Sequence, residues 1–305
     1  MSHEINRVLS TAANGVWAID TGKAQQIAAM LALRADGEPS AGFEPRPRQT
    51  ALRETLATED GTVHVLRVHG TIFPRANILS EFSGGVSLVQ FQQAFQQAAQ
   101  DTSASAIILD VDSPGGMVDF VPETAAMIRA ARNGERPIVA VANPIAASAA
   151  YWLASQADEL LTTPSGAVGS IGVYMMHEDI SAALEMQGVK PTFIFDGIRK
   201  VERNNAEPLS KEARGAMQEE VSDIFSRFVA DVATARGVDE SVVRADPESA
   251  DASFGGGRAV LAERAVSAGL ADGIATLAEV MQRFAGSGRQ RNASMQMRRR
   301  RLQVI

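Results

Sequence analysis

The chain of 305 residues contains no cysteine and only four histidines. The absence of cysteine excludes disulfide bonds, cysteine nucleophiles, thiolate zinc sites and iron–sulfur clusters, and the few histidines argue against a histidine-rich metal site. Covalent catalysis, if the chain performs any, must therefore use serine, threonine or lysine. We expect no metal ion and no other cofactor.

Long apolar runs are also missing from the sequence. No stretch approaches the roughly 20 residues that span a bilayer, and the N-terminal residues lack the continuous apolar segment of a signal peptide. A chain that is 45% hydrophobic and 21% charged has the composition of a soluble globular protein. We therefore expect a cytoplasmic protein that does not bind a membrane.

The net charge of −7 is unevenly distributed. Residues 286–305 hold six arginines and no acid, so the rest of the chain is strongly acidic. This segment opens with Gly–Ser–Gly and has no sustained apolar periodicity, which predicts a flexible basic tail. Its arginine cluster at 298–301 is the one feature that suggests contact with nucleic acid or an acidic partner, and a solvated basic end is the plainer alternative.

Hydrophobic periodicity divides the remaining chain into two parts. Residues 1–58 read as an N-terminal helix, at about 22–34, followed by a linker rich in Gly and Pro. From 59 to 285, apolar strands alternate with helices, which predicts an α/β domain of parallel βαβ units closed by a C-terminal helical segment. Within it we also expect a strand over KPTFIFDG (190–197) and a long helix from about Lys211 to Arg236.

A glycine turn, DSPGG, occupies Asp112 to Gly116, where an apolar strand ends and a helix is expected to begin. Adjacent glycines allow the backbone to approach a bound group and can direct amide N–H donors toward a developing oxyanion. A Gly–Gly pair by itself is more often a tight strand-to-helix turn. The oxyanion interpretation of this motif therefore depends on the motifs that follow it in the sequence.

One strand later, Ser148 stands between pairs of alanines in ANPIAASAAYWLAS, at the expected start of a helix. Small neighbours leave its hydroxyl open to a polypeptide, as a nucleophile requires, although a serine at such a place is more commonly a helix cap. A nucleophilic serine needs a base, for which the candidates after it are His177 and Lys200. A lysine acts as a base only when neutral, and a lysine in a charged loop is usually a solvated surface residue.

Four motifs in this order, DSPGG, AASAAYWLAS, GAVGSIGV and GIRKVERNNAEPLS, resemble those of the S49 serine peptidases, and most closely the phage head-maturation or capsid-assembly branch. The resemblance runs from about Val63 to Ala285, with a lesser echo in the N-terminal WAID…AAMLALR segment. The family is similar to signal peptide peptidase A. It implies an α/β fold of the Clp-protease/crotonase-like type and a Ser–Lys dyad.

The resemblance also implies a role for each matching residue. Ser148 matches the nucleophile, Lys200 matches the general base, and Ser170 matches a serine that orients this lysine. By position, Gly115 and Gly116 would supply the oxyanion donors. Phage members commonly carry a Gly and a Pro after the lysine, where this chain reads KVERNNAEPLS, so the conformation of that loop is expected to differ.

The function implied is that of a serine endopeptidase that cleaves capsid, scaffold or portal proteins during phage or prophage head maturation. A homo-oligomer is also implied, and whether Lys200 would act in its own or a neighbouring subunit stays open. The alternatives are a cytosolic bacterial signal-peptide-peptidase-like protease, a catalytically silent capsid scaffold protein, and a crotonase-like acyl-CoA enzyme. A Ser–His–Asp triad with His177 as base is the rival mechanism.

Overall fold

The structure is a computed structural model, and it describes residues 16–19, 52–58, 61–76, 85–244 and 254–285. The helix expected at 22–34, most of the linker that follows it and the basic tail at 286–305 lie outside the described residues. The end of the expected linker is an exception, because residues 53–58 form a strand that pairs with the central sheet, so the α/β domain begins before residue 59.

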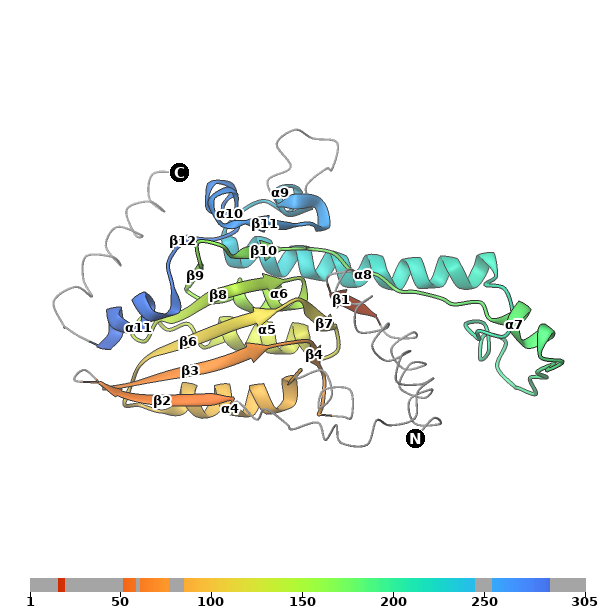
Figure 1. Ribbon diagram of the computed structural model, residues 1–305, viewed down its shortest axis with the longest axis horizontal. Helices are drawn as coiled ribbons and strands as arrows, with labels where there is room; N and C mark the ends of the chain where they lie inside the picture. Colours follow the sequence, from red (N-terminus) through yellow and green to blue (C-terminus); the bar gives the residue numbers. More distant parts are fainter. Residues whose placement is uncertain (1–15, 20–51, 59–60, 77–84, 245–253, 286–305) are drawn as a thin grey trace, which may run out of the picture.

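Among the described residues, eight strands form a mixed sheet at the centre of the domain, in the order β11-β10-β8-β6-β3-β2, with β9 beside β8 and β12 beside β9 (Figure 1). The inner pairs are parallel, and β2 and β11 are antiparallel to their neighbours. The parallel α/β fold class expected from the alternation of strands and helices is therefore confirmed. The strands are β2 (Arg53–Thr58), β3 (Gly61–His69), β6 (Ala104–Ser113), β8 (Ile138–Ala147), β9 (Glu159–Thr162), β10 (Ala167–Gly169), β11 (Ala259–Leu261) and β12 (Gly273–Ile274).

Helices cover the two faces of this sheet unequally (Figure 1). One face packs against α4 (Leu88–Gln100), α5 (Val121–Ala130), α6 (Ala149–Ala154) and the C-terminal half of α8 (Lys211–Arg236), around the larger apolar core. The other face carries a smaller cluster beneath α11 (Leu277–Ala285). Strand side chains alternate between the faces, so Val63 and Val65 of β3 belong to the smaller cluster and Leu66 belongs to the larger core. Two short helices, α9 (Glu240–Arg244) and α10 (Ala262–Ala268), complete the C-terminal part.

A second, smaller sheet adjoins the carboxyl end of β6. Its order is β1-β7-β4-β5, formed by β1 (Trp17–Ile19), β7 (Gly115–Met117), β4 (Ile72–Phe73) and β5 (Val86–Ser87). Because β6 ends at Ser113 and β7 begins at Gly115, the glycine turn of the DSPGG motif connects the two sheets. The strand β1 pairs antiparallel with β7 and forms one edge of the smaller sheet.

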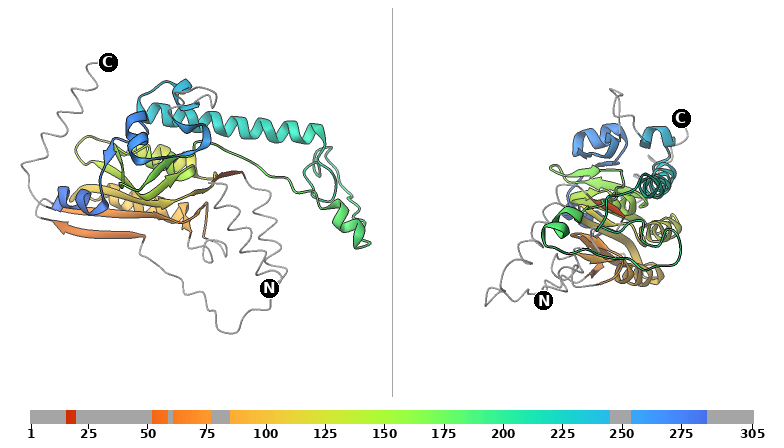
Figure 2. Two further views of the ribbon diagram at one scale, coloured as in Figure 1. Left: turned by 45° about the horizontal axis from the view of Figure 1, so that its top comes forward. Right: turned by 90° about the vertical axis from the view of Figure 1, so that its right-hand side faces the viewer.

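Residues 175–220 form an arm that projects from this body (Figures 1 and 2). The arm contains α7 (Ser181–Met186), the loop that follows it and the N-terminal part of α8. The long helix expected from Lys211 to Arg236 is confirmed. The strand expected at 190–197 is wrong, because no described strand lies beside this segment to pair with it, and Ile194 there is 97% exposed.

Candidate active site

Ser148 lies at the corner where β8 ends and α6 begins. Its backbone has φ 56° and ψ −120°, a region that residues with a side chain rarely adopt and that persists only when the surroundings hold it. The Ser148 amide donates to the Gly169 carbonyl at 2.7 Å, and its hydroxyl donates to the Gly172 carbonyl at 3.4 Å. The long second bond leaves the hydroxyl weakly held, and the side chain is nearly fully buried.

The helix that follows fixes this corner in the core. The alanines on both sides of Ser148 are fully buried, so the small residues at these positions allow close packing. One turn later, the Trp152 ring stacks on Phe228 of α8 with centroids 4.4 Å apart, and its indole N–H donates to Asp231 at 3.0 Å. The Tyr151 hydroxyl donates to the Leu270 carbonyl at 2.9 Å, and burial raises the pKa of this phenol. Tyr151 is therefore a neutral structural donor at physiological pH.

Gly115 contacts the Ser148 corner directly. It has φ 99°, and a Cβ placed on it would lie 3.0 Å from both the Ala147 carbonyl oxygen and Ser148 Cβ. Its amide donates to the Ser113 hydroxyl at 3.2 Å. A Cβ on the adjacent Gly116 would overlap the backbone of Ile72. Both positions therefore require glycine, and the chain brings the turn expected to hold an oxyanion against the candidate nucleophile.

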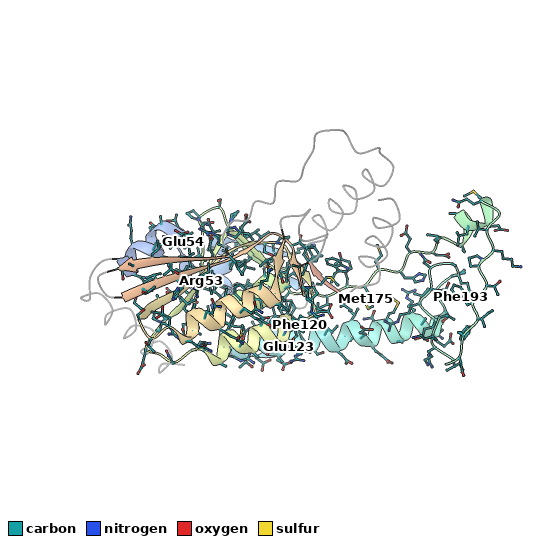
Figure 3. The ribbon with its side chains drawn as sticks, turned by 90° about the horizontal axis from the view of Figure 1, so that it is seen from below. Arg53, Glu54, Phe120, Glu123, Met175 and Phe193 are labelled. Carbon is teal, nitrogen blue, oxygen red and sulfur yellow. The ribbon has the colours of Figure 1, made fainter. Side chains whose placement is uncertain are left out.

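Lys200 lies on the arm, apart from this corner. It is exposed and lines a pocket of about 390 Å³ together with Met175, Phe193, Met217 and other side chains of the arm. Figure 3 labels Met175 near the point where the arm leaves the body and Phe193 further out. Within the described residues, no hydrogen bond joins Lys200 to Ser148. The sequence paired these two side chains, and a single copy of the chain does not bring them together.

Ser170, expected to orient the lysine, stays with the body. It has φ 53°, its amide donates to the Arg258 carbonyl at 2.9 Å, and its hydroxyl donates to the Gly257 carbonyl at 3.2 Å. The hydroxyl oxygen keeps acceptor capacity for a further donor. The rival base, His177, lines the same arm pocket as Lys200, and its Nε2–H donates to the Asn204 carbonyl at 2.9 Å. A single copy therefore places neither candidate base at Ser148.

One segment that packs on this corner, the strand β1, was not predicted from the sequence. The built Cβ of Gly115 would overlap the carbonyl oxygen of Ala18, and Ala18 itself is fully buried. Two signals in the sequence fall here, the apolar run VWAI, which is too short to predict an element, and the weaker family resemblance of the WAID segment, which does not indicate a partner.

The described residues also bear on metal binding and on membrane insertion. In that part of the chain, no group of three or more His, Asp or Glu side chains is arranged to hold a metal ion. No described helix is both long and apolar enough to cross a membrane.

Comparison with known proteins gives a family match and two similar phage proteins. The model of peptidase family S49 matches residues 130–290. The capsid assembly protease C of Escherichia phage lambda is 34% identical over 253 residues, covering 83% of this chain and 53% of that protein. The head–tail preconnector protein GP5 of Enterobacteria phage P21 is 32% identical over 219 residues, covering 72% of this chain and 43% of that protein. The chain thus spans about half the length of these relatives.

Among solved structures, a membrane protease specific for a stomatin homologue from Pyrococcus horikoshii matches 71% of this chain and 78% of its own, with 17% identity and a TM-score of 0.39. An enoyl-CoA hydratase/isomerase family member matches with 12% identity and a TM-score of 0.40, over 79% of this chain and 75% of its own. The family match covers more than half of the sequence, including Ser148, Ser170 and Lys200. The chain belongs to peptidase family S49.

Proposed function

We propose that the chain is a serine endopeptidase in which Ser148 is the nucleophile and Lys200 is the general base. The observation that carries the proposal is the corner at Ser148, where an unusual backbone conformation holds a weakly bonded hydroxyl against the glycine turn. Membership of a peptidase family supports it.

The chemistry is acyl transfer through a covalent ester. The Ser148 oxygen attacks the carbonyl carbon of the scissile peptide bond while Lys200 accepts the hydroxyl proton. The amides of Gly115 and Gly116 donate to the oxyanion of the tetrahedral intermediate, and for Gly115 this replaces its bond to Ser113. Lys200 then gives its proton to the leaving amine, and in the second half it activates the water that hydrolyses the ester. Ser170 accepts a hydrogen bond from Lys200 and orients it.

The distance between arm and body suggests that Lys200 reaches the Ser148 of a second copy. The helix α8 rises roughly 16 Å between Met217, which lines the pocket of Lys200, and Phe228, which packs beside the Ser148 helix. Because α8 is continuous, the arm cannot fold back onto its own body without breaking this helix. We therefore propose a homo-oligomer in which the arm of one copy completes the site of its neighbour.

Exposed apolar side chains support this association. Of the ten large apolar side chains that are exposed among the described residues, seven lie on the arm between 176 and 198, including Ile194 and Ile198, each more than 90% exposed. Exposed apolar side chains concentrated on one segment favour a surface that another protein covers.

For the biological role, we propose cleavage of capsid, scaffold or portal proteins during phage head maturation, in the cytoplasm of the host. The two phage relatives, named for capsid assembly and for the head–tail preconnector, support this substrate class.

Mixing two inactive variants tests the dyad and its arrangement together. Ser148→Ala and Lys200→Ala should each abolish hydrolysis of a peptide, and His177→Ala should keep most of it. If each site takes its serine from one copy and its lysine from the next, an equimolar, co-refolded mixture of the two inactive variants should recover about a quarter of wild-type activity. A mixture that forms oligomers but stays inactive would contradict the shared site. An active Lys200→Ala variant with an inactive His177→Ala variant would contradict the dyad.

A further inference from the structure

The residues Val16 to Ile19 are buried against the candidate active site, although they come from the far N-terminal part of the sequence. None of the four is more than 9% exposed. On one side, β1 runs antiparallel to β7, with Ile19 opposite Gly115 and Ala18 opposite Gly116. The segment therefore lies along the turn that would hold the oxyanion.

The other side of β1 is also paired. The Trp17 amide donates to the Tyr174 carbonyl at 3.0 Å, and the Tyr174 amide donates to the Trp17 carbonyl at 2.9 Å. The amide of Val118, just after β7, donates to the Val16 carbonyl at 3.3 Å. Both backbone edges of a single extended strand are thus satisfied by β7 on one side and by Tyr174 on the other.

This strand passes directly beside the nucleophile. The position that a Cβ of Gly115 would take lies within 3.0 Å of three atoms, which are the carbonyl oxygens of Ala18 and Ala147 and the Cβ of Ser148. The Ala18 backbone is therefore next to the Ser148 side chain. Proteins that bind an extended peptide commonly add it as a strand, using main-chain hydrogen bonds for affinity and side-chain pockets for specificity. A substrate crossing Ser148 would need the place that β1 occupies.

We propose that Val16–Ile19 is a substrate-like strand that fills the peptide-binding groove beside Ser148 and keeps the site closed until it is displaced. This inference rests on the proposed function, because it takes Ser148 as the nucleophile. As part of the same chain, β1 has a high effective concentration at the groove, and a free peptide must compete against it. Only three β1 residues pair with β7, so the strand is short enough to be displaced.

The segment also indicates which peptides the groove accepts. Ala18 is fully buried, and its carbonyl oxygen lies against the turn at Gly115, so a larger side chain at this position would have to displace its neighbours. Trp17 and Ile19 on either side are buried and apolar. The groove therefore selects an extended, uncharged segment with a small residue between two large apolar ones.

A pocket lies beside Val118, the residue that pairs with the N-terminal end of β1. Its volume is about 520 Å³, and Val118, whose amide binds the Val16 carbonyl, is one of its lining residues. Phe120 and Glu123, labelled in Figure 3, line it as well. A substrate would place in the groove four residues that correspond to Val16–Ile19. The substrate residues that precede these four would reach this pocket.

The test is to expel the strand and measure access to Ser148. Ala18→Asp places a carboxylate in a fully buried position, which is unfavourable enough to drive β1 out. The matched control is Ala57→Asp, at an exposed position of β2. We expect a fluorophosphonate probe to label Ser148, and a fluorogenic peptide to be hydrolysed, about tenfold faster or more in Ala18→Asp, because the open state becomes the main one. Ala57→Asp should match wild type, and the synthetic peptide Val-Trp-Ala-Ile should slow Ala18→Asp toward the wild-type rate.

A second measurement covers the case in which Ala18→Asp does not fold, as judged by circular dichroism. A recognition sequence for a site-specific protease is inserted between residues 37 and 45 of the full chain and then cut. Dilution should release the N-terminal fragment and raise the labelling rate of Ser148, and the added peptide should lower it again.

The possible failures are distinguishable. If Ser148 is labelled at the same rate in wild type, in folded Ala18→Asp and in the cut, diluted protein, the strand does not block the site and this inference is wrong while the proposed function stands. If Ser148 is labelled in none of them and no peptide is hydrolysed, the proposed function itself is wrong, and this inference with it.

Discussion

Replacing Phe228 with alanine removes the ring that holds α8 against the helix starting at Ser148. Phe228 is fully buried, and its ring lies almost parallel to that of Trp152, with an angle of 4° between the planes. Truncating a buried phenylalanine to alanine leaves a cavity and costs about 3 to 5 kcal/mol, of which an aromatic pair accounts for about 0.5 to 1.5. We expect Phe228→Ala to lose about 4 kcal/mol of the free energy of unfolding.

Thermal unfolding followed by circular dichroism measures this loss. One kcal/mol shifts Tm by roughly 2 to 4 °C in a domain of this size, so Phe228→Ala should melt roughly 8 to 16 °C below wild type. The matched control is Phe225→Ala on the same helix, where the ring is only half-buried and lies under the Arg244 guanidinium at 5.5 Å. It should cost about 1 kcal/mol. Equal losses in the two variants would refute the reasoning, because they would show that the Trp152 contact does not anchor α8.

Three further predictions concern the site and the stability of the fold. Gly115→Ala should lower kcat about 100-fold or more, because its Cβ would overlap the Ala18 carbonyl oxygen and crowd Ser148, which moves the oxyanion donor, whereas Gly134→Ala, also at a positive φ but with open space around it, should keep its activity in the same peptide assay. The rate of peptide hydrolysis should rise with pH into the alkaline range, because a lysine acts as a base only when it is neutral. A rate that rises once, with an apparent pKa near the ordinary histidine value of about 6.5, would instead favour a histidine base. Hydrogen bonds from Ser103 lower the pKa of Asp101 to about 2 from its ordinary 3.8. The ionised carboxylate therefore stabilises the fold fully above pH 3.8, and this stabilisation is lost as the pH falls toward 2. Asp101→Asn should therefore melt below wild type at pH 6, with a difference that shrinks in acid, and a constant difference across this range would contradict the assignment.

The sequence predicts the local elements of this fold well, because their signals are local. The long helix α8 begins after Ser210, whose hydroxyl accepts from the Ala213 amide, and ends before Gly237, which has the left-handed conformation with φ 68°. Both ends are therefore marked by residue types with a defined physical role. The alternation of apolar strands and helices likewise predicts the parallel sheet, because only a crossover connection can join parallel strands.

The arrangement of the candidate site is only partly predictable. The DSPGG turn and Ser148 follow neighbouring parallel strands, so their meeting at one edge of the sheet follows from the topology. The location of Lys200 depends on how the arm leaves the body, which no periodicity encodes. The strand wrongly expected at 190–197 shows the same limit, since a strand needs a partner and the sequence does not say whether one is present. The pairing of Ala18 with Gly116 joins segments far apart in the chain, and no local signal marks it.

Among the described residues, the helix α8 is fixed to the body only through its C-terminal half, at a clamp formed by the contacts of Arg236 and Phe228, and its N-terminal half projects freely. At its C-terminus, the Arg236 guanidinium donates to the Gly269 carbonyl at 3.0 Å and forms an ion pair with Asp272 at 2.9 Å, while Phe228 packs in the core. The helix then runs about 25 Å from Phe228 to Lys211, so a tilt of a few degrees at the clamp moves the free end by roughly 2 Å. A displacement of about 1 Å at a reacting group can cost about 100-fold in rate. Substitutions at the clamp, far from Ser148, should therefore change the alignment of Lys200, the base that we propose.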